Sequence, residues 1–338
     1  MSALAIDEPT WARALRSLDA ATAATLICHV APDGDALGSM LAVGAALRSR
    51  GVDVTCTWGD DPFRVPSAYS WLPGIDAAVA PADVDPAPPL LIVLDTGSVD
   101  RLGVLRGLAD TAGDIIVIDH HANNAGPIRG QALVDPTAAA TAVIAAELIE
   151  RLGARLDVDI ATCLYTGLVT DTGGFAHSVT TPSVHALAGR LLEAGVRPDE
   201  VHRRIWGTQP FRYVELLAAV LGRARLDADA LGGRGLVWTA VTQDDLAASG
   251  LEIEDVDPVM DSLRQTAEAD VAVVLKQDRD GSYRASTRSR GGSDVGAACG
   301  ALGGGGHRLA AGFTSHLDAE ATIAALRERL ELLERAAS

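Results

Sequence analysis

Four short apolar runs constrain the fold of this chain more than any other feature of its sequence. They cover residues 25–30, 52–57, 89–94 and 114–118, and each has the length of one strand. Strands that are apolar on both faces are typical of a parallel sheet covered by helices on both sides. In that architecture ligands collect beyond the carboxyl ends of the strands. We therefore expect an α/β fold with a site at this edge of a mostly parallel sheet.

Helical patterns separate these runs, and a second α/β pattern follows them. Helices are expected at 37–50, 137–152, 159–170 and 182–193. Further strands are expected at 235–242, 269–277 and 282–287, followed by a terminal helix at 318–335. The chain of 338 residues is long enough for two domains. We predict a catalytic domain at 1–195, a helical linker at 196–225 and a smaller α/β domain at 226–338.

The charge and the cysteines of the chain exclude several classes of function. A net charge of -17 would repel a long nucleic acid, but a short anionic substrate needs only local positive charge, which metal ions supply. No apolar run reaches the roughly 18 residues that span a bilayer, so a cytoplasmic protein without membrane contact is expected. The four cysteines form no CxxC pair, which favours reduced, packed thiols over a zinc knuckle or disulfides.

The first polar motif is His29-x-x-x-Asp33-x-Asp35, which lies where the first run ends and the next helix begins. One imidazole and two carboxylates at this spacing can converge on a metal ion. A purely structural interpretation is equally open, because Asp33-Gly34 is a common turn and Asp35 could cap the helix. Asp95 closes the apolar run at 89–94 and is likewise either a ligand or a turn residue.

A rarer motif, Asp119-His120-His121, follows the run at 114–118. Asp171 is expected at the C-terminal end of a helix, where a carboxylate opposes the helix dipole unless a cation lies nearby. These motifs together place five aspartates and two or three histidines on one rim of one sheet. Oxygen and imidazole ligands without thiolates suit Mn²⁺, with Mg²⁺ or Co²⁺ as alternatives. Two such ions about 3.5 to 4 Å apart would activate water for phosphoester hydrolysis.

The four motifs resemble those of the DHH phosphoesterase superfamily, and the second half resembles its DHHA1 partner domain through Ser286-x-Arg288-Ser289 and Gly303-Gly304-Gly305-Gly306-His307. The resemblance covers nearly the whole chain. It implies metal ligands, catalytic residues and residues that orient ligands. One metal is expected on His29, Asp33 and Asp95, and a second on Asp35, Asp95, His120 and Asp171. Asp95, His121 and Asp119 are the expected catalytic residues, with Asp119 and Asn124 orienting their neighbours.

Within this superfamily the compact two-domain form resembles oligoribonucleases that act on very short RNAs (nanoRNA) and on 3′-phosphoadenosine 5′-phosphate, and in some members on cyclic dinucleotides. This resemblance implies Mn²⁺-dependent hydrolysis of pApA, nanoRNA, 3′-phosphoadenosine 5′-phosphate and cyclic di-AMP. It also implies a homodimer.

Glycines and arginines of the second half predict a nucleotide site. Glycines at 303–306 let a backbone approach a phosphate, and nearby cationic side chains add donors. A flexible loop is the structural alternative. The predicted substrate-binding residues are Arg284, Ser286, Arg288, Gly304, Gly305, Gly306, His307 and Asn124.

Two other functions use the same residues. An inorganic pyrophosphatase or polyphosphatase would share the metal site but lack the glycine run that is present here. A nucleotide-binding protein without catalysis would normally have lost a ligand, whereas every ligand position is filled.

Overall fold

The computed structural model describes residues 4–121 and 127–337, which fold into two compact units. The first unit ends at Thr208 and the second begins at Gln209. This division falls inside the stretch predicted as a helical linker. That stretch contains α7 (Pro198–Ile205), in the first unit, and α8 (Phe211–Gly222), in the second.

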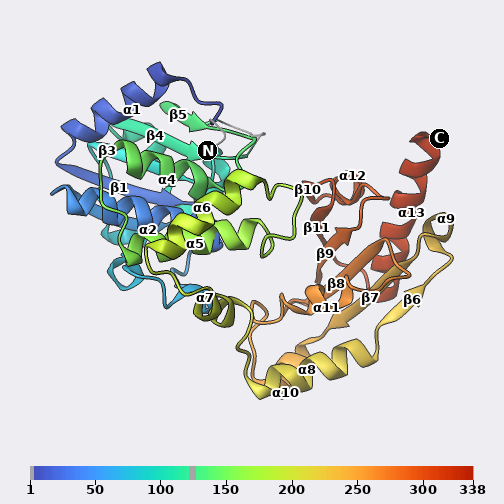
Figure 1. Ribbon diagram of the computed structural model, residues 1–338. Coiled ribbons are helices and arrows are strands. Elements are labelled where there is room, and N and C mark those ends of the chain that lie inside the picture. The colour runs from blue at the N-terminus through green and yellow to red at the C-terminus, as the bar shows by residue number, and fades with distance from the viewer. Residues whose placement is uncertain (1–3, 122–126, 338) are drawn as a thin grey trace. The chain divides into compact units, whose positions relative to one another are not determined.

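A five-stranded sheet forms the centre of the first unit (Figure 1), in the order β2-β1-β3-β4-β5 with every pair parallel. Its strands are β1 (Ala23–Cys28), β2 (Asp53–Trp58), β3 (Leu90–Leu94), β4 (Asp114–Asp119) and β5 (Gln131–Val134). All five residues of β3 are buried, as expected for a strand with both faces covered. The chain leaves β1 toward β2 on one side and returns at β3 on the other. The carboxyl ends of β1 and β3 are therefore the point at which such folds bind ligands.

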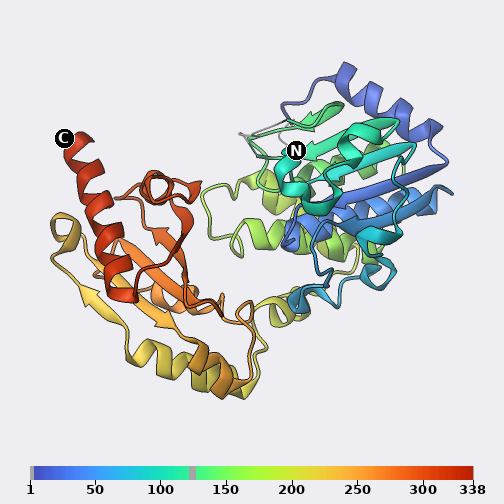
Figure 2. The same cartoon turned by 180° about the vertical axis from the view of Figure 1, so that it is seen from behind.

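The two faces of this sheet are covered unequally, as Figures 1 and 2 show from opposite sides. One face packs against long helices, and the other against a short helical segment. The long elements are α1 (Glu8–Ala20), α2 (Gly34–Ser49), α4 (Thr141–Arg151), α5 (Val158–Asp171) and α6 (Pro182–Glu193), and the short ones are η4 (Val99–Leu105) and α3 (Leu108–Thr111). Gly38 allows α2 and α5 to touch, because a Cβ atom there would lie 2.3 Å from the carbonyl oxygen of Cys163. Three single turns complete the unit, η1 (Ser67–Tyr69), η2 (Ile75–Ala77) and η3 (Pro81–Asp83).

The second unit has a six-stranded mixed sheet in the order β10-β11-β9-β8-β7-β6, in which only β7 and β8 are parallel. Its strands are β6 (Arg225–Asp227), β7 (Leu236–Val241), β8 (Val271–Gln277), β9 (Tyr283–Ser289), β10 (Gly305–His307) and β11 (Ala310–Ser315). One apolar cluster packs α9 (Ala230–Gly233), α12 (Val295–Ala301) and α13 (Ala319–Ala337) on one face. Another packs α8, α10 (Gln243–Ser249) and α11 (Val259–Leu263) on the other face.

These two units confirm the fold class predicted from the sequence, and they correct several elements. The helix expected from residue 137 begins at Thr141, because the side chain of Asp135 accepts from the amide and hydroxyl of Thr137 and holds the preceding residues in a turn. Several elements were not predicted, among them α1, β5 and β11. A flexible loop was the structural alternative for the glycine run, but Gly305–His307 pair with β11 as an edge strand. Within the described part of the chain no helix combines the length and the apolar character needed to cross a bilayer.

Candidate metal centre

Strand register brings three of the predicted side chains abreast at the carboxyl edge of the first sheet. Cys28 of β1 pairs with Leu94 of β3, so the residues that follow them, His29 and Asp95, lie side by side. The pairing of β3 with β4 adds Asp119 at the same level. Asp95 has a φ of 61°, a left-handed conformation that is uncommon for aspartate. Backbone strain of this kind concentrates at functional sites.

Asp33 is both the N-cap of α2 and a neighbour of His29. Its Oδ1 accepts from the amides of Asp35 at 3.1 Å and Ala36 at 3.0 Å, whereas its Oδ2 lies 3.8 Å from Nε2 of His29. One interpretation of the sequence was that Asp35 caps this helix. The structure assigns the cap to Asp33 and keeps the other Asp33 oxygen directed at the strand ends.

His29 is buried and presents its Nε2 atom to the carboxylates. Its Nδ1 lies 2.8 Å from the carbonyl oxygen of Val30, and only a protonated nitrogen can donate there. The lone pair of the neutral ring is therefore on Nε2, which lies 3.3 Å from Oδ2 of Asp95. Fixing one ring nitrogen on a carbonyl is how proteins orient histidine ligands of metals.

His120 is held in the same way from the other side of Asp95. Its Nδ1 lies 3.2 Å from the carbonyl oxygen of Ala138, and its Nε2 lies 3.1 Å from Oδ2 of Asp171 and 3.7 Å from Oδ1 of Asp95. Asp95 thus offers one oxygen to each of two imidazoles.

Asp119 holds His121 rather than joining the carboxylates. Its Oδ1 accepts from the amide of His121 at 3.1 Å and from Nδ1 of the same residue at 2.7 Å. Asp119 is fully buried, and the side chain of His121 is about one quarter exposed. The ring of His121 is therefore fixed and partly exposed, with its Nδ1–H donating to Asp119.

Two residues that the sequence analysis did not single out complete the site. Thr141 donates its hydroxyl to Oδ1 of Asp95 at 2.8 Å and its amide to Oδ2 of Asp35 at 2.5 Å. The amide of Ala142 donates to Oδ1 of Asp35 at 2.8 Å. These donors lie in the first turn of α4, whose start was predicted four residues too early.

The crowding of acidic groups shifts the pKa values of the site. Burial disfavours a charged His120, but its hydrogen bond to Asp171 and the charges of Asp35, Asp171 and Asp95 outweigh burial and raise the pKa of His120 to about 10. Burial and the charge of Asp95 raise the pKa of Asp33, and the same causes raise that of Asp35 well above its usual range. Burial by itself would raise the pKa of Asp95, but the hydrogen bond to His29 and the charges of the histidines outweigh burial and lower this pKa. The cluster is therefore short of positive charge.

A divalent cation fits this set of donors. Within each of three groups the ligand atoms lie within 4.8 Å of one another. The groups are His29 with Asp33 and Asp95, Asp35 with His120 and Asp171, and Asp95 with His120 and His121. Asp95 and His120 each belong to two of them. Carboxylate oxygens and imidazole nitrogens without thiolates match the preferences of Mn²⁺ and related ions. All the predicted ligand residues lie in these groups. Asn124, predicted to orient ligands and substrate, lies outside the described residues.

The predicted substrate residues of the second unit share one face of its sheet. Arg288 of β9 pairs with Ala310 of β11, which pairs with His307 of β10, and paired residues of antiparallel strands point to the same side. Ser286 and Arg284 follow at alternate positions on this side of β9. The apolar cluster on this face includes residues of β8 but, among those described, none of β9, β10 or β11. We call the group Arg284, Ser286, Arg288 and His307 the polar sheet face.

Charges on the polar sheet face are only partly neutralised. Arg284 donates to Asp278 at 2.9 Å, and its Nε is buried without a hydrogen-bond partner in the described chain. Arg288 donates to the carbonyl oxygen of Thr287, and no described carboxylate pairs with it. Burial and the charge of Arg264 lower the pKa of Arg288. Such donors are suited to a phosphate.

The glycines beside this face differ in whether the fold leaves space for a Cβ atom. A Cβ atom on Gly304 would lie 2.1 Å from the carbonyl oxygen of Gly312, and one on Gly306, which has a φ of 142°, would lie 2.6 Å from that of Ala310. Both glycines are needed for β10 to approach β11. Gly305 has open space where a Cβ atom would stand, so the fold itself does not require a glycine there.

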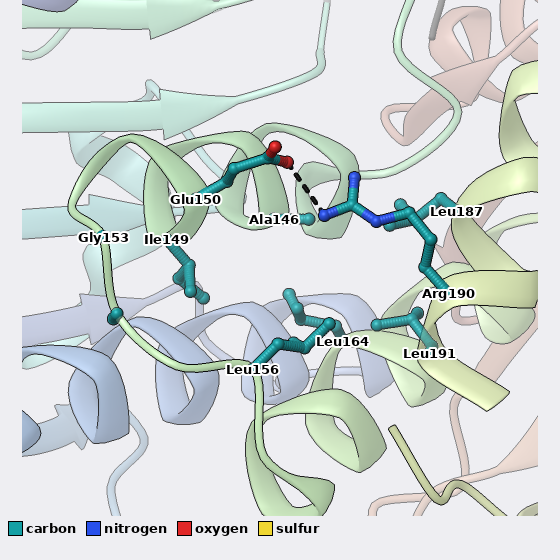
Figure 3. A pocket seen from close by; sticks show the side chains of 10 residues that line it. Ala146, Ile149, Glu150, Gly153, Leu156, Leu164, Leu187, Arg190 and Leu191 are labelled. Carbon is teal, nitrogen blue, oxygen red and sulfur yellow. Dashed lines mark hydrogen bonds and ion pairs between the residues drawn. The ribbon is translucent and has the colours of Figure 1, made fainter. Parts of the chain in front are cut away.

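A cavity of about 200 Å³ lies among helices of the first unit (Figure 3). It is lined by α4, α5, α6 and the connection between α4 and α5, mainly with leucine, isoleucine and alanine. Glu150 and Arg190 form an ion pair of 2.9 Å across it. None of the predicted site residues lines it.

A parallel sheet with carboxylates and imidazoles at its switch point defines an α/β protein with a candidate metal centre. The model of the DHH family, N-terminal domain, matches residues 24–168, and that of the DHHA1 domain matches residues 241–335. The bifunctional oligoribonuclease and PAP phosphatase NrnA of Thermus thermophilus is 36% identical over 89% of this chain and 88% of its own. The chain belongs to the DHH family, and it is a phosphoric ester hydrolase.

Solved structures show the same fold. An exopolyphosphatase-related protein from Bacteroides fragilis superimposes with a TM-score of 0.87 at 22% identity, covering 98% of both chains. RecJ of Thermus thermophilus in complex with Mn²⁺ superimposes with a TM-score of 0.57 at 16% identity, covering 98% of this chain and 56% of RecJ.

Proposed function

We propose that this protein hydrolyses short oligoribonucleotides and small nucleotides, with pApA, RNAs of two to five nucleotides and 3′-phosphoadenosine 5′-phosphate as substrates. The observation that carries the proposal is the shared position of Asp95 between His29 and His120 at the switch point of the sheet. The NrnA relative, named as an oligoribonuclease and PAP phosphatase, supports this substrate class. Cyclic di-AMP is a further candidate substrate, because its hydrolysis also breaks a phosphodiester bond.

Two divalent ions, with Mn²⁺ the first choice, would be held by the residues that converge here. His29, Asp33 and Asp95 would hold one ion. Asp35, His120 and Asp171 would hold the other, together with Asp95, whose Oδ1 lies 3.7 Å from Nε2 of His120. When bound, such ions supply a nucleophile at neutral pH and neutralise charge on a phosphoryl group. The complex of RecJ with Mn²⁺ supports this choice of ion.

Protein side chains around the ions orient groups and transfer protons. The carbonyl oxygens of Val30 and Ala138 keep Nδ1 of His29 and His120 protonated, which leaves each Nε2 as a ligand atom. Asp119 does the same for His121, whose Nε2 would exchange a proton with the leaving oxygen.

The polar sheet face would bind the nucleotide. Arg288 would donate to a phosphate without breaking an ion pair, and Gly305 would allow close approach of the substrate. Ser286 and His307, on the same side of the sheet, would add further donors. Binding by a few donors explains how a chain with a net charge of -17 would act on an anionic substrate only when it is short.

The proposal is tested by stripping the protein of metal and measuring release of mononucleotide from pApA. Activity should be absent with a chelator and return on addition of Mn²⁺, with Mg²⁺ and Co²⁺ as comparison ions. Full turnover in the presence of a chelator that removes all bound metal would contradict it.

A further inference from the structure

The first turn of α4 holds two of the carboxylates at the metal centre. Thr141 is fully buried, and its hydroxyl donates to Oδ1 of Asp95, which is 2% exposed. Oδ1 is the oxygen nearer His120, at 3.7 Å from Nε2, whereas Oδ2 is the one at 3.3 Å from Nε2 of His29. The hydroxyl therefore fixes which oxygen of Asp95 is directed at which imidazole.

The same turn limits how Asp35 can bind a ligand. Oδ1 of Asp35 accepts from the amide of Ala142 and from the hydroxyl of Ser39, at 2.8 and 3.0 Å, and Oδ2 accepts from the amide of Thr141. An ionised carboxylate has about four lone-pair positions, so three are occupied. Only one position on Oδ2 remains, which makes Asp35 a ligand through a single oxygen.

Asp35 in turn takes the place of a capping residue for α4. Ala140 stands at the N-cap without a side chain that could accept, and the first amides of a helix need acceptors. Asp35, from α2, supplies them, and its negative charge is favourable at the positive end of the helix. Gly167 of α5 allows this packing, because a Cβ atom there would lie 2.6 Å from Oδ1 of Asp35. Helix position and carboxylate orientation are thus fixed together.

We infer that Thr141 is a positioning residue that orients Asp95 toward the group Asp35, His120 and Asp171 and so sets the affinity of that group for its cation. The inference rests on the metal assignment in the proposed function. Replacing the hydroxyl with a methyl group leaves both amides on Asp35, so the effect should fall on Oδ1 of Asp95, the oxygen that faces this group. The group His29, Asp33 and Asp95, in which Oδ2 of Asp95 faces His29, should keep its affinity for its cation.

Titration of metal-free protein with Mn²⁺, followed by calorimetry and by the electron paramagnetic resonance of paired ions, tests this inference without any assay of activity. The variants are Thr141→Val and Thr141→Ala, which lack the hydroxyl, and Thr141→Ser, which keeps it. Thr137→Val is the matched control, because it removes an exposed hydroxyl that bonds to Asp135 in the preceding turn. Circular dichroism confirms that each variant is folded.

Wild type, Thr141→Ser and Thr137→Val should each bind two ions. In Thr141→Val and Thr141→Ala one of the two sites should weaken by about 10- to 100-fold, as for loss of other residues that orient metal ligands, and the signal of paired ions should fade at equal Mn²⁺. Two sites of wild-type affinity in both hydroxyl-free variants would overturn the inference and leave the proposed function intact. Failure of the wild type to bind Mn²⁺ would overturn both.

Discussion

The metal centre of the first unit and the polar sheet face of the second unit hold their functional side chains in opposite ways. At the metal centre, Asp35 and Asp119 are fully buried, and each accepts hydrogen bonds from named donors. On the polar sheet face, Arg288 is only half-buried and His307 is exposed. Arg288 donates to one backbone carbonyl, and the described residues offer it no carboxylate.

This difference indicates that the side chains of the metal centre need a fixed orientation, whereas those of the polar sheet face do not. Burying several carboxylates is costly unless each is hydrogen-bonded and a cation offsets their charge, so the metal centre is orientated before any ligand arrives. A half-buried cationic side chain such as that of Arg288 keeps part of its hydration until an anion binds. We therefore expect the first unit to set the chemical step and the second to set affinity.

Asp95→Asn should give the largest effect. It removes charge from the residue shared by both imidazoles, so several kcal/mol of transition-state stabilisation, and about 1000-fold or more in kcat, should be lost. Steady-state kinetics on pApA, with Mn²⁺ content measured in parallel, checks this. Near-normal kcat at full Mn²⁺ occupancy would contradict the proposal that Asp95 is the ligand shared by both ions.

Arg288→Ala should raise KM and leave kcat nearly unchanged. A hydrogen bond to a charged group contributes about 1.5 to 3 kcal/mol, which corresponds to roughly 10- to 150-fold in affinity. Arg290→Ala is the matched control, since Arg290 already donates to the carbonyl oxygens of Thr266 and Ala267. An equal fall in kcat for Arg288→Ala would show that the second unit takes part in chemistry, and the division between the units would fail.

Gly305→Ala and Gly304→Ala separate ligand approach from folding. Gly305 has space for a methyl group, so its variant should keep the stability of wild type and bind pApA several-fold more weakly. Gly304→Ala meets the backbone of Gly312 and should lower the free energy of unfolding by about 1 to 3 kcal/mol. Urea unfolding and KM measurements distinguish the two. Wild-type KM in Gly305→Ala would argue that substrate does not approach this glycine.

A separate effect concerns pH in metal-free protein. The pKa of His120 is raised from its ordinary 6.5 to about 10, so its charged form stabilises the fold fully below pH 6.5, and this contribution is lost as pH rises toward 10. The difference in urea midpoint between wild type and His120→Gln should therefore shrink between pH 6.5 and 10. A difference that stays constant or grows would contradict the charged state assigned to His120.

The strands that carry the metal centre could be predicted, because apolar runs mark them and polar residues mark where they end. His29, Asp95 and Asp119 were identified in this way, and the strand register accounts for their proximity. Thr141 was not identified, because nothing local separates it from Thr137 as the start of a helix. The start is decided by two sets of hydrogen bonds, those that Asp135 accepts from Thr137 and those that Asp35, 106 residues away, accepts from the first turn of the helix.

Other elements lacked a signal in the sequence or had a signal that was overlooked. β11 (Ala310–Ser315) contains small residues and few of the β-branched residues that predict strands, so only pairing with β9 defines it. In α1 the buried residues Trp11, Ala14 and Leu18 have helical spacing, and this pattern could have predicted the helix.

The most direct test of the account is one product analysis, in Mn²⁺, across pyrophosphate, 3′-phosphoadenosine 5′-phosphate, pApA, cyclic di-AMP and RNAs of increasing length. We predict mononucleotides from pApA and from RNAs of two to five nucleotides, AMP from 3′-phosphoadenosine 5′-phosphate, and rates that fall as the RNA lengthens. Rapid cleavage of pyrophosphate with no product from any nucleotide would contradict the account.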